Sequence, residues 1–318
     1  MANSKTMLIT GATGFIGSCL IHKLVDTNVY DIHIIKRKQS NIWRIKNILD
    51  YVSIHDVDII DYTKLRKVIK SVKPDLIFHT ATYGGYPFQK DINKIIQTNI
   101  IGTINLVNVC AEVGFDAFIN TGSSSEYGLK DKPIQETDLP EPISEYGVAK
   151  EAATLFCQAK AKKERLPIVT LRLFSPYGYY EEPTRLIPSV IKSCLLNKNP
   201  KVSSPHSVRD FIFVEDVVNA YIKAINFSSS SGEVFNIGYG QQHSVGYVVN
   251  KIIRLTGDKV KPEWGSIPKR SNEPTSWQAD ISKAKDILHW KPKYSIEHGL
   301  KKTIEWFEKN ISLYTQRE

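Results

Sequence analysis

The sequence predicts an α/β protein with a doubly wound parallel sheet and a smaller C-terminal lobe. Three observations lead to this expectation. Short apolar runs rich in β-branched residues alternate with amphipathic stretches up to about Leu173, a glycine-rich turn follows the first run, and Pro and Gly become frequent after Leu173. Apolar strands that alternate with helices are typical of a parallel sheet covered on both faces. Right-handed crossovers between such strands give the doubly wound arrangement.

Six apolar runs predict the strands, and they cover residues 6–10, 32–35, 52–54, 76–78, 117–119 and 168–171. Amphipathic stretches predict helices over residues 62–72, 92–113, 145–164, 281–288 and 296–311. The first predicted helix of the chain starts within the glycine-rich turn itself. Consecutive strands and helices of this length are the units from which a doubly wound sheet is built.

Composition and charge narrow the class of protein. The 318 residues are 42% hydrophobic and 24% charged, which is typical of a globular protein. The formal charge of +9 predicts an anionic partner without naming it. The four cysteines, Cys19, Cys110, Cys157 and Cys194, form no CxxC pair, so we expect buried free thiols and no metal site. With no signal peptide and no membrane-length apolar run, we expect a cytoplasmic protein without a membrane partner.

The first strand leads directly into a GxxGxxG turn whose residues are Gly11, Thr13, Gly14, Phe15, Ile16 and Gly17. Glycines let the backbone turn tightly and approach a pyrophosphate, which then lies at the positive N-terminus of the following helix. Between the first strand and first helix of an alternating α/β chain, this spacing predicts a Rossmann-type dinucleotide site.

The end of the second strand carries Lys36 and Arg37 where an acidic residue would bind the adenosine 2′-hydroxyl of NAD. Cations at this point suit the 2′-phosphate of NADP. The pattern therefore favours NADP(H) as cofactor, with NAD(H) as the alternative. Asp58 and Ile59, which follow the third strand, are placed to reach the adenine.

Tyr146 and Lys150 form a YxxxK pair on a predicted helix, so both side chains lie on one face. A neighbouring ammonium favours the phenolate and would lower the pKa of the tyrosine, which could then exchange a proton with a substrate oxygen. Ser123 begins a serine cluster just past the fifth strand, at the sheet edge where ligands bind in this architecture. A serine there can hydrogen-bond the reacting oxygen.

With these motifs in order, the sequence resembles the extended short-chain dehydrogenase/reductase family, in its nucleotide-sugar epimerase, dehydratase and 4-ketoreductase branch. Further matching segments are residues 79–81, 99–103, 171–174, 209–214, 235–238 and 268–274. The resemblance implies that Tyr146 is the catalytic acid/base, that Lys150 holds the nicotinamide ribose, and that Ser123 is the catalytic Ser/Thr. It also implies that Ala81 and Asn99 contact the cofactor. The substrate contacts that it implies are Tyr83, Ser124, Ser125, Ser175, Arg185, Arg209 and Arg270.

Departures from the family pattern bear on the reaction. Ser124 and Ser125 stand where the 4,6-dehydratases carry the Asp-Glu pair that eliminates water, which argues against dehydration. We therefore expect an NADPH-dependent 4-ketoreductase that acts on a nucleotide-linked 4-keto-6-deoxy sugar, with Tyr146 as proton donor. The alternative is a 4-epimerase that uses NAD(P). A non-catalytic cofactor-binding scaffold is a third reading, weakened because Ser123, Tyr146 and Lys150 are all present.

The same resemblance suggests how the chain is divided and which partners it has. We expect residues 1–174 to form the NADP(H)-binding domain, with segments near 206–238 returning to it, and residues 175–318 to form mainly the nucleotide-sugar-binding lobe. The partners expected are a nucleotide-diphosphate sugar and a second copy of the chain, paired through the helices over 92–113 and 145–164. We expect no nucleic-acid partner, since two diphosphate-bearing ligands account for the positive charge.

Overall fold

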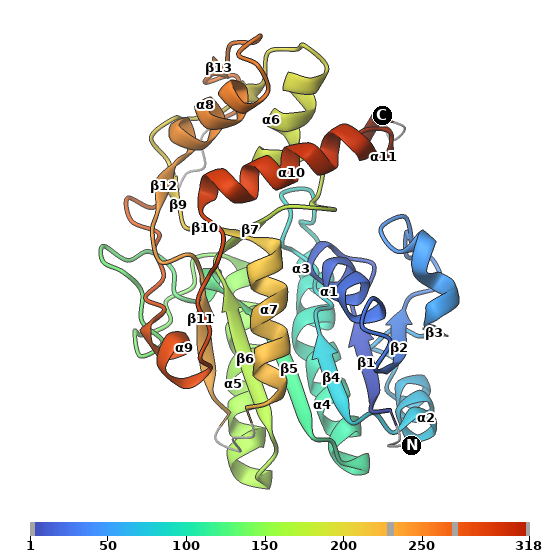
Figure 1. Cartoon of the computed structure of the whole chain (residues 1–318). Coiled ribbons are helices and arrows are strands. Elements are labelled where there is room, and N and C mark those ends of the chain that lie inside the picture. Colours follow the sequence, from blue (N-terminus) through green and yellow to red (C-terminus); the bar gives the residue numbers. More distant parts are fainter. Residues whose placement is uncertain (1–3, 228–231, 269–272, 316–318) are drawn as a thin grey trace.

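The computed structural model describes residues 4–227, 232–268 and 273–315. Figure 1 shows a helix-covered sheet in the lower half of the view and a smaller group of helices and short strands above it. The sheet has seven strands in the order β11-β6-β5-β4-β1-β2-β3, and every pairing is parallel. The predicted α/β class with a doubly wound parallel sheet is confirmed.

The strands of this sheet are β1 (Thr6–Thr10), β2 (Asp31–Lys36), β3 (Ser53–Asp56), β4 (Leu76–His79), β5 (Ala117–Ser123), β6 (Ile168–Leu173) and β11 (Val234–Ile237). Every residue of β4 and β6 is buried, because these interior strands are covered on both faces. The edge strand β3 is mostly exposed. All six predicted strands are present, and β11 returns from late in the sequence to pair with β6.

Helices cover both faces of the sheet. On one face α1 (Phe15–Val25) contacts α7 (Val214–Ile225), and on the other α4 (Gly102–Val113) contacts α2 (Tyr62–Val72) and α5 (Glu145–Glu164). Alternate residues of β1 serve the two faces, since Met7 and Ile9 belong to one buried apolar cluster and Leu8 to the other. The structure matches the bounds predicted for α2 and α5.

The helix predicted over 92–113 is interrupted. It consists of α3 (Ile92–Ile96), a π-helical turn η2 (Gln97–Ile101) and α4. Asn99 lies in this turn and is buried, with its side chain bonded to the loop that follows β4. A π-turn inserts an extra residue into the helical repeat and is frequent at functional sites. The prediction of one regular helix was therefore wrong at this point.

The remaining helices are η1 (Lys46–Tyr51), η3 (Ser124–Glu126), α6 (Leu186–Leu195), α8 (Val245–Leu255), α9 (Ser282–Ile287), α10 (Ile296–Asn310) and α11 (Ser312–Thr315). Short strands form three two-stranded sheets: β7 (Ser175–Tyr177) with β10 (Phe211–Phe213), β9 (Val208–Arg209) with β12 (His243–Ser244), and β8 (Lys201–Val202) with β13 (Glu263–Trp264). Of these elements, α6, α8 and α10 contact one another above the carboxyl ends of the central strands. The division into two domains remains a prediction.

Three further expectations from the sequence concern the cysteines, membrane-spanning helices and metal sites. All four cysteines are buried, as predicted. Across residues 4–227, 232–268 and 273–315, no helix has the length and apolarity needed to cross a bilayer. Within the same ranges, no group of three or more His, Cys, Asp or Glu side chains is arranged to hold a metal ion.

Candidate active site

A cavity of about 870 Å³ opens at the carboxyl ends of the central strands. It brings together nineteen of the residues that the sequence singles out: Gly11, Thr13, Gly14, Phe15, Ile16, Gly17, Lys36, Arg37, Asp58, Ile59, Ala81, Tyr83, Ser123, Ser124, Ser125, Tyr146, Ser175, Arg185 and Arg209. Two others, Asn99 and Lys150, are buried and do not line it. Arg270 lies outside the described residues.

The glycine turn forms one wall of this cavity. Gly11 has a φ of +72°, and a Cβ there would lie 2.5 Å from the carbonyl carbon of Thr80, so the turn requires glycine. Helix α1 begins at Phe15 with Gly14 as N-cap, and no side chain caps its first amide groups. These N–H groups are therefore available to an anion beside the glycines. The turn fits the pyrophosphate of a dinucleotide, which is what the sequence predicts.

The end of β2 forms the far end of the same wall. The ammonium of Lys36 pairs with Asp56 at the end of β3. Arg37 is exposed and lines the cavity with Ser40 and Asn41. Two hydroxyl or amide groups and a guanidinium are suited to a phosphate, although Lys36 already has a carboxylate partner. The donor set therefore fits a 2′-phosphorylated cofactor mainly through Arg37.

Tyr146 is the titratable group at the centre of the site. It lies in the first turn of α5, whose N-cap Ser144 accepts a hydrogen bond from the N–H of Gly147 at 3.1 Å. Hydrogen bonds with the side chains of Thr82 and Ser123 lower the pKa of Tyr146, but its burial is the larger effect and raises that pKa above the ordinary value. Three elements thus place three hydroxyl groups around one point of the cavity.

Lys150 follows Tyr146 by one helical turn and is 2% exposed. Burial lowers the pKa of its ammonium, and the negative charge of Glu126 raises it. The sequence predicts that Lys150 lowers the pKa of Tyr146, but in the structure burial outweighs the charges around the phenol. The phenol is consequently protonated at neutral pH and is able to donate a proton.

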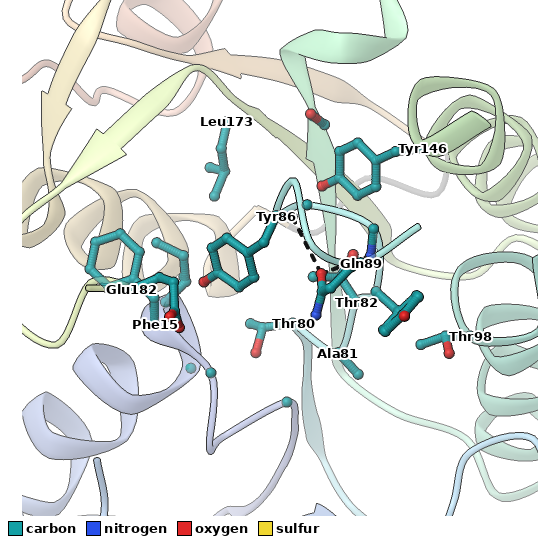
Figure 2. Close-up of a pocket in the computed structure, with 18 of the residues that line it drawn as sticks. Phe15, Thr80, Ala81, Thr82, Tyr86, Gln89, Thr98, Tyr146, Leu173 and Glu182 are labelled. Carbon is teal, nitrogen blue, oxygen red and sulfur yellow. Dashed lines mark hydrogen bonds between the residues drawn. The ribbon is translucent and has the colours of Figure 1, made fainter. Parts of the chain in front are cut away.

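The loop after β4 lies against Tyr146. Gln89 accepts hydrogen bonds through Oε1 from the N–H of Gly84 at 2.9 Å and of Tyr86 at 3.3 Å, which closes the loop into a tight turn. Figure 2 shows the Tyr86 ring projecting into the cavity from this loop, with Gln89 beside it. Tyr86 stacks on Phe88 with the ring centroids 5.5 Å apart. An aromatic wall therefore borders the space next to Tyr146.

Asn99 supports that loop from behind. Its Nδ2 donates to the carbonyl oxygen of Tyr83 at 2.6 Å, and its Oδ1 accepts from the N–H of Tyr83 at 3.1 Å and from the hydroxyl of Thr82 at 2.9 Å. Because it does not line the cavity, we expect its effect on a cofactor to pass through Thr82 and Tyr83.

Another part of the lining holds arginines with carboxylate neighbours: Glu181 and Glu182 line the main cavity, and Glu181 and Glu273 line an adjoining one. Ser175, Arg185 and Arg209 line both the main cavity and the adjoining one of about 170 Å³. Arg209 pairs with Glu273 at 3.0 Å and donates to the carbonyl oxygen of Val208 at 2.6 Å, so its guanidinium is held in a fixed direction. Two arginines at the junction of two cavities suit a diphosphate that joins two larger groups.

The cavity is also lined by Arg44, Glu181 and Thr82, which the sequence does not single out. Arg44 donates to the carbonyl oxygens of Tyr180 at 2.6 Å and of Thr13 at 3.3 Å, which ties the glycine turn to the segment before α6. Glu181 is 4% exposed, lies 3.7 Å from Arg185, and has its pKa raised to about 8 by burial. No local motif marks either residue. Thr82 is different, since its hydroxyl follows directly on the matching segment 79–81 at a strand end.

The sheet and the glycine turn define a Rossmann-type dinucleotide-binding protein with a second ligand cavity. A family model described as the NAD dependent epimerase/dehydratase family matches residues 7–238. The chain belongs to this family, within the extended short-chain dehydrogenases/reductases, and is an enzyme of the nucleotide-sugar 4-epimerase/dehydratase group.

Individual proteins agree with that assignment. The UDP-glucose 4-epimerase of Thermotoga maritima, solved with UDP-glucose, is 29% identical, with a TM-score of 0.89 over 96% of this chain and 99% of that one. The UDP-glucuronic acid 4-epimerase of Bacillus cereus, solved with UDP-glucuronic acid and NAD, is 28% identical, with a TM-score of 0.86 over the same shares. The dTDP-D-glucose 4,6-dehydratase of Mus musculus is 29% identical over 99% of this chain and 92% of its own length.

Proposed function

We propose that the enzyme is a nucleotide-sugar 4-epimerase in which Tyr146 exchanges a proton with the oxygen on C4 of the sugar. The observation that carries this proposal is the meeting of Tyr146, Ser123 and Thr82 at one point of a cavity that the glycine turn and Arg209 also line. The similarity to two solved 4-epimerases supports it. The sequence alone favours a 4-ketoreductase, whereas the similarity to these two 4-epimerases favours epimerisation.

Each proposed role follows from what the side chain can do where it lies. Ser123 hydrogen-bonds the C4 oxygen. The positive nicotinamide ring of a bound oxidised cofactor would lower the pKa of Tyr146, so that its phenolate could take the proton of the C4 hydroxyl and the phenol could later return it. Arg185 and Arg209 hold the diphosphate of the nucleotide sugar at the junction of the two cavities. Ser124 and Ser125 line the sugar space and have no carboxyl group to eliminate water.

The proposed cofactor site runs from the glycine turn to Tyr146, with Asp58 and Ile59 beside the adenine and Tyr83 and Ala81 nearer the reacting end. A nicotinamide dinucleotide supplies the hydride chemistry at C4. Lys150 lies one helical turn beyond Tyr146, where burial lowers the pKa of its ammonium and Glu126 raises it. Arg37 favours a 2′-phosphate, whereas the Bacillus cereus epimerase was solved with NAD.

Arg37 is also the observation that favours a second candidate, the NADPH-dependent 4-ketoreductase. One experiment separates the two. We would incubate the protein with UDP-, dTDP-, GDP- and CDP-linked hexoses and their 4-keto-6-deoxy derivatives, with either cofactor, and follow products by NMR. Interconversion of two C4 epimers without net cofactor use supports the epimerase. Stoichiometric oxidation of NADPH by a 4-keto sugar would instead establish the reductase.

We also propose that the enzyme is a homodimer. Apolar side chains stay exposed along the helices predicted to pair: Ile92 is 49%, Ile96 41%, Val148 52% and Leu155 54% exposed. A second copy of α3 and α5 would cover this face, as the resemblance implies.

A further inference from the structure

We propose that Glu126 is a positioning residue of this active site: its carboxylate, held by Arg172 and Thr154, fixes Ser123 from behind. The inference rests on the proposed function, in which Ser123 and Lys150 serve Tyr146. Glu126 is completely buried at the end of η3 and does not line the cavity. It therefore acts through its neighbours and not on a ligand.

The first connection is to Ser123. Glu126 Oε1 accepts a hydrogen bond from the backbone N–H of Ser123 at 2.6 Å, while Ser123 Oγ accepts from the N–H of Ser125 at 3.1 Å. The two bonds form a capping box around the turn. Because one lone pair of Ser123 Oγ is committed to Ser125, its hydroxyl hydrogen is left to point toward the cavity and Tyr146.

The second connection fixes the other carboxylate oxygen of Glu126. Oε2 of Glu126 accepts from Nε of Arg172 at 2.5 Å and from the hydroxyl of Thr154 at 3.0 Å. Arg172 is itself held by Glu151 at 2.5 Å and lies over the ring of Tyr127. One guanidinium, one hydroxyl and one backbone N–H therefore hold the Glu126 carboxylate in a single position.

The surrounding chain leaves room for this arrangement. A Cβ on Gly122 would lie 2.9 Å from Glu126 Oε1, so the residue before Ser123 must be small for the carboxylate to reach the Ser123 N–H. Gly122 lines the cavity on its other side. The position of Glu126 is thus built into the end of β5.

The third connection is electrostatic. The titratable groups that face Lys150 are Glu126 from η3, Cys157 from α5 and His79 from β4. Burial raises the pKa of Cys157 to about 12 and lowers that of His79 to about 3, so both are neutral at physiological pH. Glu126 is therefore the anion that offsets the burial of the Lys150 ammonium.

The test compares two isosteric variants, each of which replaces one of the two carboxyl groups that are hydrogen-bonded to Arg172. Glu126→Gln removes the charge that faces Lys150, whereas Glu151→Gln is the matched control on the other side of the guanidinium. The readout is the titration of Lys150 by NMR of ¹³Cε-lysine, assigned with Lys150→Met. We expect the pKa of Lys150 to fall by about 1 unit or more in Glu126→Gln and to change by a smaller amount in Glu151→Gln, whose carboxyl group also contacts Glu126. Equal shifts in both variants, or none in either, would overturn the electrostatic role of Glu126.

Glu126→Asp tests the contact with Ser123 separately. It keeps the charge but is too short to reach the Ser123 N–H, so we expect an unshifted Lys150 and a kcat lowered about tenfold or more with KM unchanged. A kcat equal to that of the wild type would refute the claim that Glu126 positions Ser123. If Glu126→Gln does not fold, Glu126→Asp alone tests that claim. A wild type that turns over no nucleotide sugar would refute the proposed function, while the Lys150 titration would still report on Glu126.

Discussion

Gly84 lies against the ring of Tyr146: a Cβ built on Gly84 would be 3.2 Å from Cδ2 of Tyr146 and 2.8 Å from Cγ1 of Ile95. Its φ of +100° also belongs to a region that side chains rarely adopt. The loop after β4 can therefore approach Tyr146 this closely only with glycine at this position.

We expect Gly84→Ala to lower kcat about tenfold to hundredfold, because the added methyl group displaces Tyr146 from its proton-transfer geometry. Gly114→Ala is the matched control, since Gly114 has a φ of +79° and nothing within 4 Å of its built Cβ. Both changes cost stability through backbone strain, of order 1–3 kcal/mol, but the control should keep its kcat. Steady-state kinetics give kcat for both variants. Equal losses of kcat would mean that the close approach of Gly84 to Tyr146 does not affect catalysis.

We expect the preference between NADP(H) and NAD(H) to depend on Arg37. Removing its guanidinium in Arg37→Ala should weaken NADPH binding about tenfold to hundredfold, as expected for a lost charge-assisted hydrogen bond, and leave NADH binding unchanged. Lys38 is exposed and does not line the cavity, so Lys38→Ala serves as control. Quenching of intrinsic fluorescence measures both affinities. If Arg37→Ala weakens the binding of NADH and NADPH equally, the guanidinium does not bind the 2′-phosphate.

His79 makes folding stability depend on pH. Its Nδ1 lies 2.7 Å from Thr10 Oγ1 and its Nε2 2.9 Å from Thr103 Oγ1, and burial lowers its pKa from the ordinary 6.5 to about 3. Between these values the unfolded chain binds a proton that the folded chain does not. The free energy of unfolding contributed by this group therefore falls as pH drops below 6.5, by about 1.4 kcal/mol per unit.

A His79→Asn variant isolates this effect, because Glu181, whose pKa is raised to about 8, contributes with the opposite sign in both proteins. Between pH 7 and pH 5 we expect the wild type to lose about 2 kcal/mol more than the variant in urea unfolding. Parallel curves for the two proteins would mean that His79 titrates normally in the folded state.

The proposed dimer is tested at Leu155, which is 54% exposed on α5. Leu155→Glu places a charge in the apolar face and should give a monomer by light scattering, if the wild type is a dimer. Leu139 is 70% exposed and lies outside the helices of the proposed interface, so Leu139→Glu should leave the mass unchanged. A monomeric wild type, or a dimeric Leu155→Glu, would contradict the interface.

The parts of the site that the sequence predicts are those built from local patterns. The glycine turn, the YxxxK pair and the serine cluster each sit at the end or start of one element, so the fold class fixes which edge of the sheet they share. That is why Gly11, Ser123 and Tyr146 line one cavity as expected.

Other parts depend on contacts between distant segments and leave no local pattern. Arg44 donates a hydrogen bond to Tyr180, which lies more than a hundred residues later in the sequence. Glu126 accepts a hydrogen bond from Arg172 because β5 and β6 are neighbouring strands. The π-turn around Asn99 has the same origin, since the buried amide bonds to the loop after β4. Apolar periodicity carries no information about such tertiary hydrogen bonds.

The most direct test of the account is the turnover of Tyr146→Phe with a nucleotide sugar that the wild type converts. The variant keeps the ring and loses only the hydroxyl, so we expect cofactor binding to persist and kcat to fall about 10²- to 10⁴-fold. A Tyr146→Phe enzyme with wild-type kcat would show that this hydroxyl does not exchange the proton at C4.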